Sequence, residues 1–109
     1  MTDIIRLPDL DLNEKNTFIM TLTPEEMRKI NLDKSQQYLT FGGRMNWIRY
    51  LNSLPANKTA ELIGVAPSTL RSYEEDKTVP LPETIGRFCK VFQVKDEWLM
   101  SGNGDVFRI

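Results

Sequence analysis

The stretch "AELIGVAPSTLRSYEED" (residues 60–76) contains the pattern that decides the fold. A short apolar run ends at Gly64, a residue that can take the positive φ found just past the end of a helix. A second amphipathic run begins at Pro67, and proline suits the first position of a helix. On this run Leu70 and Tyr73 share one face, as in a helix packed against a core. The stretch therefore predicts two short helices joined by a tight turn.

Apolar residues recur at helical spacing on both sides of this stretch, so a mainly α fold is expected. Five short helices are predicted, at residues 43–54, 56–64, 66–76, 82–93 and 95–102. We expect them to pack as one compact domain over residues 41–102. Its second and third helices form a helix-turn-helix layout, with Val65 as a buried anchor in the turn.

Residues 1–40 form an N-terminal extension that is expected to add a short strand or helix to this domain. Residues 1–16 are polar and acidic, which predicts an extended arm. The β-branched and apolar run "TFIMTL" (17–22) predicts a strand. A helix is predicted at 23–30, where Thr23, Pro24 and Glu26 supply a capping box with proline at the first helical position.

Residues 103–109 form a C-terminal tail. The run "SGNGD" (101–105) is typical of a turn after a helix. "DVFRI" (105–109) predicts a short strand, which would pair with residues 17–22 of the same chain or of a partner chain.

The composition excludes several classes of function. The chain has 109 residues, one cysteine and no histidine, so neither a zinc site nor a Cys–His catalytic pair can be assembled within it. Cys89 lies between Phe88 and Phe92 and is expected to be buried. We expect no enzyme activity, no cofactor and no metal. No signal peptide or membrane-spanning run is present, which favours a cytoplasmic protein without a membrane partner.

The formal net charge of −1 argues mildly against nucleic-acid binding, because phosphate contacts supply much of that affinity. The charge is unevenly distributed, however. Residues 1–41 hold five Lys and Arg against seven Asp and Glu, whereas residues 42–109 hold nine against eight. The acidic excess therefore lies in the N-terminal part.

The segments "RMNWIRYLNSLPANKTAELIGVAPSTLRSYEEDKTVP" (44–80) and "VFQVKDEWLMSG" (91–102) together resemble the Cro and phage-repressor type of helix-turn-helix domain, often called Xre-like. The resemblance covers about residues 41–102. It implies a compact five-helix, lambda-repressor-like fold whose third helix lies in the major groove of DNA.

The resemblance also implies roles for individual residues. The recognition helix would span about 67–75, and its base-contacting positions match Pro67, Ser68, Arg71 and Ser72. Phosphate contacts would come from the start of the second helix, from the recognition helix and from the loop after it, at Asn57, Lys58, Thr69, Lys77 and Thr78. Arg49 and Glu74 match a structural salt bridge between the first and third helices.

Several residues depart from the family pattern. Ala56 replaces a glutamine that meets phosphate, Thr59 replaces a leucine, and Asp76 replaces a loop glycine. Pro82 is unusual at the start of the fourth helix. Because Glu75 and Asp76 would bring negative charge towards DNA, the sequence predicts weak phosphate affinity or a need for dimerisation.

Trp47, Tyr50 and Leu51 form an apolar stripe where relatives commonly carry charge. A stripe of this size is expected to be covered, since exposed apolar patches associate. The N-terminal extension would cover it through Phe18, Met20 and Leu22, or through Met27 and Ile30. The alternative cover is a second copy of the chain.

The sequence thus favours a sequence-specific regulator of transcription that binds double-stranded DNA. It would act as a homodimer on a palindromic operator, as a repressor, and the resemblance is compatible with a phage or mobile-element origin. Two alternatives stay open. One is an antitoxin-type regulator whose N-terminal segment binds a toxin, and the other is a protein-interaction module that has lost DNA binding.

Overall fold

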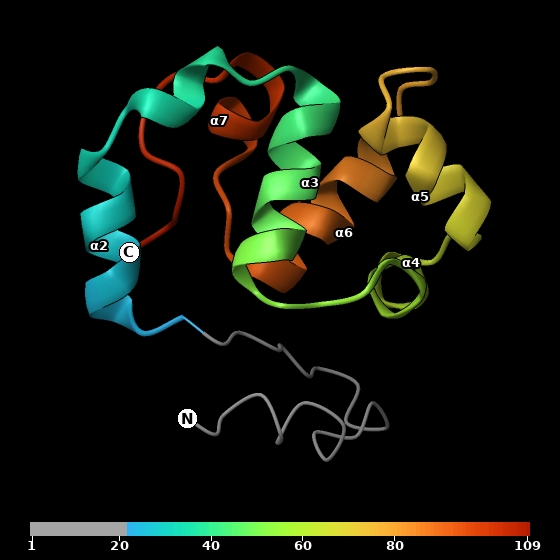
Figure 1. Ribbon diagram of the computed structural model, residues 1–109, viewed down its shortest axis with the longest axis horizontal. Helices are drawn as coiled ribbons and strands as arrows, with labels where there is room; N and C mark the ends of the chain where they lie inside the picture. The colour runs from blue at the N-terminus through green and yellow to red at the C-terminus, as the bar shows by residue number, and fades with distance from the viewer. Residues whose placement is uncertain (1–21) are drawn as a thin grey trace.

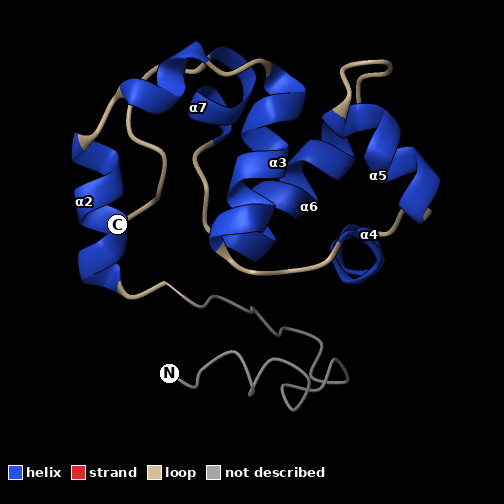
Figure 2. Cartoon of the chain, viewed as in Figure 1, coloured by secondary structure: helices blue, strands red, loops and turns tan. Residues whose placement is uncertain are grey.

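The computed structural model of the protein describes residues 22–109, which consist of helices and loops without a strand (Figure 2). In chain order the helices are α2 (Pro24–Leu32), the 3-10 helix η1 (Ser35–Tyr38), α3 (Phe41–Leu51), α4 (Ala56–Ile63), α5 (Pro67–Glu74), α6 (Pro82–Phe92) and α7 (Asp96–Ser101) (Figure 1). The mainly α fold predicted from the sequence is confirmed. The expected arm at 1–16 lies outside the described residues, as does the expected strand at 17–22 except for Leu22, which lies in a bend.

Helix α2 begins with the capping box that the sequence predicts. The side-chain oxygen of Thr23 accepts a hydrogen bond from the amide of Glu26 at 3.1 Å. In return, the amide of Thr23 donates to Glu26 Oε1 at 2.9 Å. The two bonds satisfy amides that have no partner within the helix. The helix continues to Leu32, two residues beyond its predicted end.

Helix α3 begins at Phe41, two residues earlier than predicted. Glycine has a low helix propensity, so the sequence around Gly42 gave no sign of this earlier start. The hydroxyl oxygen of Thr40 caps the helix by accepting from the amide of Gly43 at 3.0 Å. At the other end α3 stops at Leu51, earlier than predicted.

The turn between α4 and α5 follows the sequence prediction in its backbone. Gly64 ends α4 with a φ of 78°, and Pro67 is the first residue of α5. The amide of Val65 donates to the carbonyl oxygen of Ala60 at 2.9 Å, which closes the end of α4. The side chain of Val65, predicted as a buried anchor, packs against the core but is only half-buried.

The core lies among α3, α4, α5, α6 and α7, which cross one another in a compact arrangement (Figure 1). Its fully buried side chains include Met45, Ile48, Ile63, Leu70, Phe88, Phe92, Trp98 and Leu99. Cys89 is buried among them, as predicted. Burial disfavours the thiolate and raises the pKa of Cys89 to about 12. None of the helices in residues 22–109 is long and apolar enough to cross a membrane.

The N-terminal extension packs into this core from Leu22 onwards. Met27 of α2 is buried in the core cluster, and Leu22 and Ile30 pack against it. Met27 and Ile30, one of the two predicted sets of covering residues, thus pack on the same core cluster as Trp47 and Leu51. Phe18 and Met20, which belong to the other, lie outside the described residues.

The apolar stripe on α3 divides into a covered part and an exposed part. The ring centroids of Trp47 and Trp98 lie 5.8 Å apart, and both Trp47 and Leu51 pack against the core cluster. Tyr50 is 75 % exposed, so residues 22–109 of the same chain do not cover it, and its cover by a second copy stays a prediction. Successive residues are separated by about 100° around a helix. Tyr50 comes three residues after Trp47, so its side chain points in a different direction from that of Trp47 and lies on the solvent side.

The C-terminal tail does not form the predicted strand. A single antiparallel bridge joins Phe107 to Val94, so the pairing partner is the α6–α7 connection. On the opposite side of the tail, the side chain of Asn31 in α2 bonds both backbone groups of Phe107. Asn31 Oδ1 accepts from the Phe107 amide at 2.8 Å, and Nδ2 donates to the Phe107 carbonyl oxygen at 3.3 Å. Helix α2 and the tail are thereby joined through a buried side chain.

Replacing Asn31 with alanine should lower the free energy of unfolding by about 2–3 kcal/mol, because two buried backbone groups of Phe107 lose their partner. Chemical denaturation followed by circular dichroism measures this difference. Lys34→Ala is the control, since its ion pair with Asp105 is about half exposed and should contribute less than about 1 kcal/mol. Equal losses in the two variants would contradict the role given to Asn31.

Candidate nucleic-acid interface

Helix α5 turns one face to the core and another to solvent. Leu70 and Tyr73 are buried, as the sequence predicts. The residues predicted to contact bases are distributed as follows: Pro67, Ser68 and Arg71 are exposed, and Ser72 is half-buried. The short helix therefore presents hydroxyl and guanidinium donors from its first two turns on one outer face.

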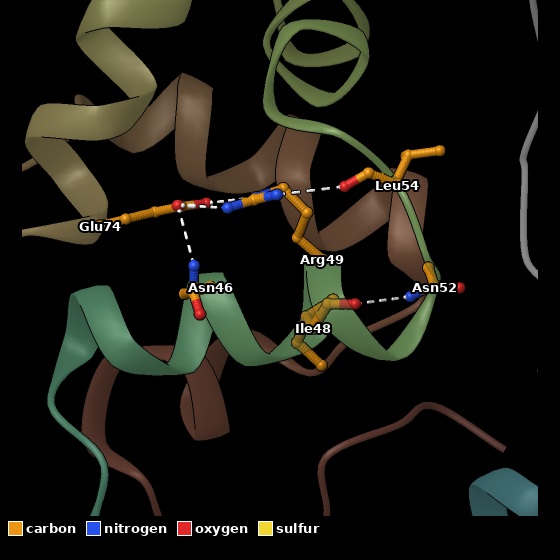
Figure 3. Close-up of polar contacts among 6 residues, drawn as sticks. All are labelled: Asn46, Ile48, Arg49, Asn52, Leu54 and Glu74. Atoms are coloured by element: carbon orange, nitrogen blue, oxygen red, sulfur yellow. Dashed lines mark hydrogen bonds and ion pairs between the residues drawn. The ribbon is translucent and has the colours of Figure 1, made fainter.

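Helix α5 is attached to α3 by a bidentate ion pair (Figure 3). Arg49 Nε donates to Glu74 Oε2 and Arg49 Nη2 donates to Glu74 Oε1, both at 2.8 Å. Asn46 Nδ2 adds a third bond to Glu74 Oε1 at 3.1 Å. The hydrogen bond to Glu74 raises the pKa of Arg49 despite its partial burial. Paired guanidinium and carboxylate groups fix orientation as well as distance, so the last turn of α5 is held in one geometry.

A second attachment, which the sequence did not reveal, joins the loop after α5 to the start of α3. Asp76 Oδ2 accepts from the hydroxyl of Thr40 at 2.7 Å, and Asp76 Oδ1 accepts from the amide of Gly42 at 2.9 Å. Both hydrogen bonds lower the pKa of Asp76, and the bond from Thr40 has the larger effect. Its carboxylate therefore has partners within the protein, whereas the sequence suggested only a negative charge facing DNA.

The helices also approach each other closely at this point. A Cβ atom at Gly42 would clash with the carbonyl oxygens of Tyr73 and Glu74. Glycine is therefore required in the first turn of α3 by the backbone of the last turn of α5.

The residues predicted to contact phosphate lie at the start of α4, within α5 and in the loop after it. Asn57, Lys77 and Thr78 are exposed, and Lys58 and Thr69 are half-buried. Lys58 pairs with Glu61 at 3.4 Å, and Lys77 pairs with Glu75 at 3.1 Å. Ion pairs at such exposed positions contribute little stability, so either lysine can exchange its carboxylate for another anion.

The hydroxyl groups of Ser72 and Thr78 are 2.9 Å apart and share a hydrogen bond. The backbone carbonyl of Ser72 also accepts from the amide of Lys77 at 2.9 Å. The loop after α5 is thereby folded back on the helix. Ser68 and Arg71 are left as the exposed polar side chains of α5 among the four predicted base-contacting residues.

Residues 49–99 match the family model described as helix-turn-helix. This match supports the resemblance to the Cro and phage-repressor type of helix-turn-helix domain that the sequence indicates. Among solved structures, the chain is similar to the P22 c2 repressor protein in complex with synthetic operator 9T in the presence of Tl+. That match has a TM-score of 0.56 and 21 % sequence identity, and it covers 58 % of this chain and 96 % of the repressor chain. The comparison with curated protein sequences gave no match.

Helix α3 carries a buried arginine that is unavailable to an external ligand. Arg44 donates to the backbone carbonyl oxygens of Leu39, Leu99 and Met100, at 2.6, 2.7 and 3.1 Å. Burial lowers the pKa of Arg44. Its role is to join the start of α3 to α7.

An open groove beside the exposed Tyr50 was not predicted. It lies at the end of α3 and the start of α4 and is lined by Asn46, Arg49, Tyr50, Ser53, Leu54 and Pro55. Within the part of the chain that the structure describes, no group of Cys, Asp and Glu side chains could hold a metal ion.

Gly42→Ala should lower the free energy of unfolding by about 1–3 kcal/mol, because the added methyl group forces α3 and α5 apart. Gly86→Ala provides a matched control in α6, where an added Cβ would meet nothing within 4 Å. That substitution should stabilise the protein by roughly 0.5–1 kcal/mol, since alanine is the better helix former. Thermal and chemical denaturation of both variants would measure the two changes in the free energy of unfolding, which should have opposite signs. Changes of the same sign would contradict the proposed close approach of α3 and α5.

Proposed function

We propose that the protein is a sequence-specific, DNA-binding regulator of transcription in which α5 is the recognition helix. The observation that carries the proposal is the exposed outer face of α5, which bears Ser68 and Arg71 while the helix is attached to α3 at Glu74 and Asp76. A helix that is rigidly held and exposes polar donors suits the major groove. The helix-turn-helix match over residues 49–99 supports the same function.

Arg71 is proposed as the main base-reading residue. Its side chain is exposed on the second turn of α5, and a guanidinium can donate two hydrogen bonds to the O6 and N7 atoms of guanine. Ser68 lies one turn earlier and supplies a shorter hydroxyl donor or acceptor. Pro67 and Ser72 border these two residues, where they would contact base edges through smaller surfaces.

Phosphate contacts are proposed on both sides of this helix, from Asn57 and Lys58 in α4, from Thr69, and from Lys77 and Thr78 in the loop. Lys58 and Lys77 would leave Glu61 and Glu75 for phosphate oxygens. This exchange costs little because both ion pairs are substantially exposed. With so few basic side chains, non-specific affinity should be low and should fall further with added salt.

A homodimer on a palindromic operator is proposed because one α5 can read only one half-site. Two recognition helices in successive major grooves would lie about 34 Å apart. Val79 and Leu81, in the loop after α5, are 74 % and 64 % exposed and offer apolar surface for contact between two copies. A dimer that occupies a promoter would act as a repressor by excluding polymerase.

Arg71→Ala should weaken binding to the specific site by about 1–3 kcal/mol, as expected for the loss of one bidentate base contact. Fluorescence anisotropy with DNA from the region upstream of the protein's own gene, and with scrambled DNA, measures the effect over a salt series. Arg28→Ala is the matched control, because it removes an equally charged, exposed side chain from α2 at the other end of the molecule (Figure 1).

The control variant should bind the specific site as the wild type does. Equal losses in Arg71→Ala and Arg28→Ala would indicate a net-charge effect and contradict the assignment of α5. Equal affinity of the wild type for both probes would contradict sequence specificity. Sedimentation of the complex checks the dimer, for which we expect two protein chains per palindromic duplex.

A further inference from the structure

We infer that Asp76, together with Thr40, is a positioning residue that sets the orientation of α5 for DNA binding. The inference rests on the proposed function and extends it to residues outside the DNA-contacting set. Asp76 lies two residues beyond the end of α5, and Thr40 immediately precedes α3. Both side chains act through the placement of α5.

The backbone at Asp76 indicates that its carboxylate has a function. Its φ is 60°, in the left-handed region where glycine is the favoured residue. An aspartate tolerates this conformation better than most residues, yet it still carries a cost that glycine does not. This backbone conformation places the carboxylate of Asp76 at the start of α3, where it accepts hydrogen bonds from the hydroxyl of Thr40 and from the amide of Gly42.

The acceptor atoms of Asp76 and Thr40 complete the N-terminus of α3. The first amides of a helix have no partner within it, and negative charge near them is favourable. The Gly42 amide donates to Asp76, and the Gly43 amide donates to the hydroxyl oxygen of Thr40 at 3.0 Å. Because Thr40 also donates to Asp76, these three hydrogen bonds form one connected set.

This set of bonds and the Arg49–Glu74 ion pair attach α5 to α3 at two separated points. Gly42 and Arg49 are about 10 Å apart along α3, given a rise of about 1.5 Å per residue. The buried side chains of Leu70 and Tyr73 hold α5 against the core, and two polar attachments restrict its direction more tightly than one would. Since α5 is about 12 Å long, a rotation of about 5° at its end would move Ser68 by about 1 Å.

If Asp76 were merely a negative charge near DNA, removing its carboxylate should have the opposite effect on DNA affinity. A carboxylate close to phosphate weakens binding, so its removal should then strengthen binding. Glu75 provides the comparison, because it is an exposed neighbour whose carboxylate pairs with Lys77 in the same loop. The two adjacent acidic residues should therefore respond with opposite signs.

The test compares Asp76→Gly with Glu75→Gln, each of which removes one negative charge. Glycine accepts the positive φ at residue 76, so a loss of binding cannot come from backbone strain. Anisotropy with the specific probe should show a loss of about 5- to 10-fold in affinity for Asp76→Gly, as expected from the loss of charge-assisted hydrogen bonds. Glu75→Gln should bind as tightly as the wild type or more tightly.

A second pair of variants tests the role of the Thr40 hydroxyl. Thr40→Val keeps the shape of the side chain and removes the hydroxyl, which donates to Asp76 and accepts from the Gly43 amide, so it should lower DNA affinity as Asp76→Gly does. Thr40→Ser retains the hydroxyl and should bind within about 2-fold of the wild type, a difference below about 0.5 kcal/mol. Unchanged or tighter DNA binding by Asp76→Gly, or equal binding by Thr40→Val and Thr40→Ser, would overturn the inference.

Hydrogen exchange of the free protein separates this inference from the proposed function. In Thr40→Val the backbone amides of Glu75 and Asp76, which bond to Arg71 and Tyr73 in the last turn of α5, should exchange faster than in the wild type. If the wild type fails to distinguish specific from scrambled DNA, the proposed function fails while faster exchange still supports the positioning of α5. Unchanged exchange at these amides would overturn the inference whatever the DNA result.

Discussion

The close approach of the first turn of α3 to the last turn of α5 is the constraint on which the rest of the helix-turn-helix domain depends. Only glycine fits at residue 42, because the carbonyl oxygens of Tyr73 and Glu74 occupy the space of a side chain. With the two backbones at this distance, Glu74 reaches Arg49 and Asp76 reaches the amide of Gly42. The outer face of α5 then has a fixed direction relative to the core.

The start of α3 is joined to several parts of the molecule at once. Arg44 joins it to α7 and to Leu39, the residue that follows η1. Thr40 joins it to the loop after α5. The extension from Leu22 onwards packs on the same core through Met27. Residues 22–40 are therefore structurally continuous with the helix-turn-helix domain, and a change in their packing would reach α5 through Leu39 and Thr40.

Features with a local cause could be predicted from the sequence. The capping box at Thr23 and Glu26 depends on residues three apart, and the end of α4 depends on Gly64. The inward faces of α5 and α6 followed from the spacing of apolar residues. The family resemblance brought Arg49 and Glu74 together in advance, although 25 residues separate them in the chain.

Contacts between residues far apart in the chain were not predicted. Asp76 lies 34 residues from Gly42 and seemed only to replace a loop glycine, because nothing nearby in the sequence shows the amide that its carboxylate meets. The first two residues of α3 were missed for a similar reason, since the need for Gly42 comes from the backbone of α5. Tyr50 was grouped with Trp47 and Leu51 by their helical spacing, which does not show which edge of such a stripe faces solvent.

The pairing of Asn31 with Phe107 has a consequence for association between molecules. An extended segment that is bridged on one side usually leaves the amide and carbonyl of the other side open to a strand from another chain. Here the carboxamide of Asn31 makes both bonds that such a strand would make at Phe107. One side chain of α2 thus closes the outer edge of the tail at this residue, so edge-to-edge aggregation at Phe107 requires that Asn31 first be displaced.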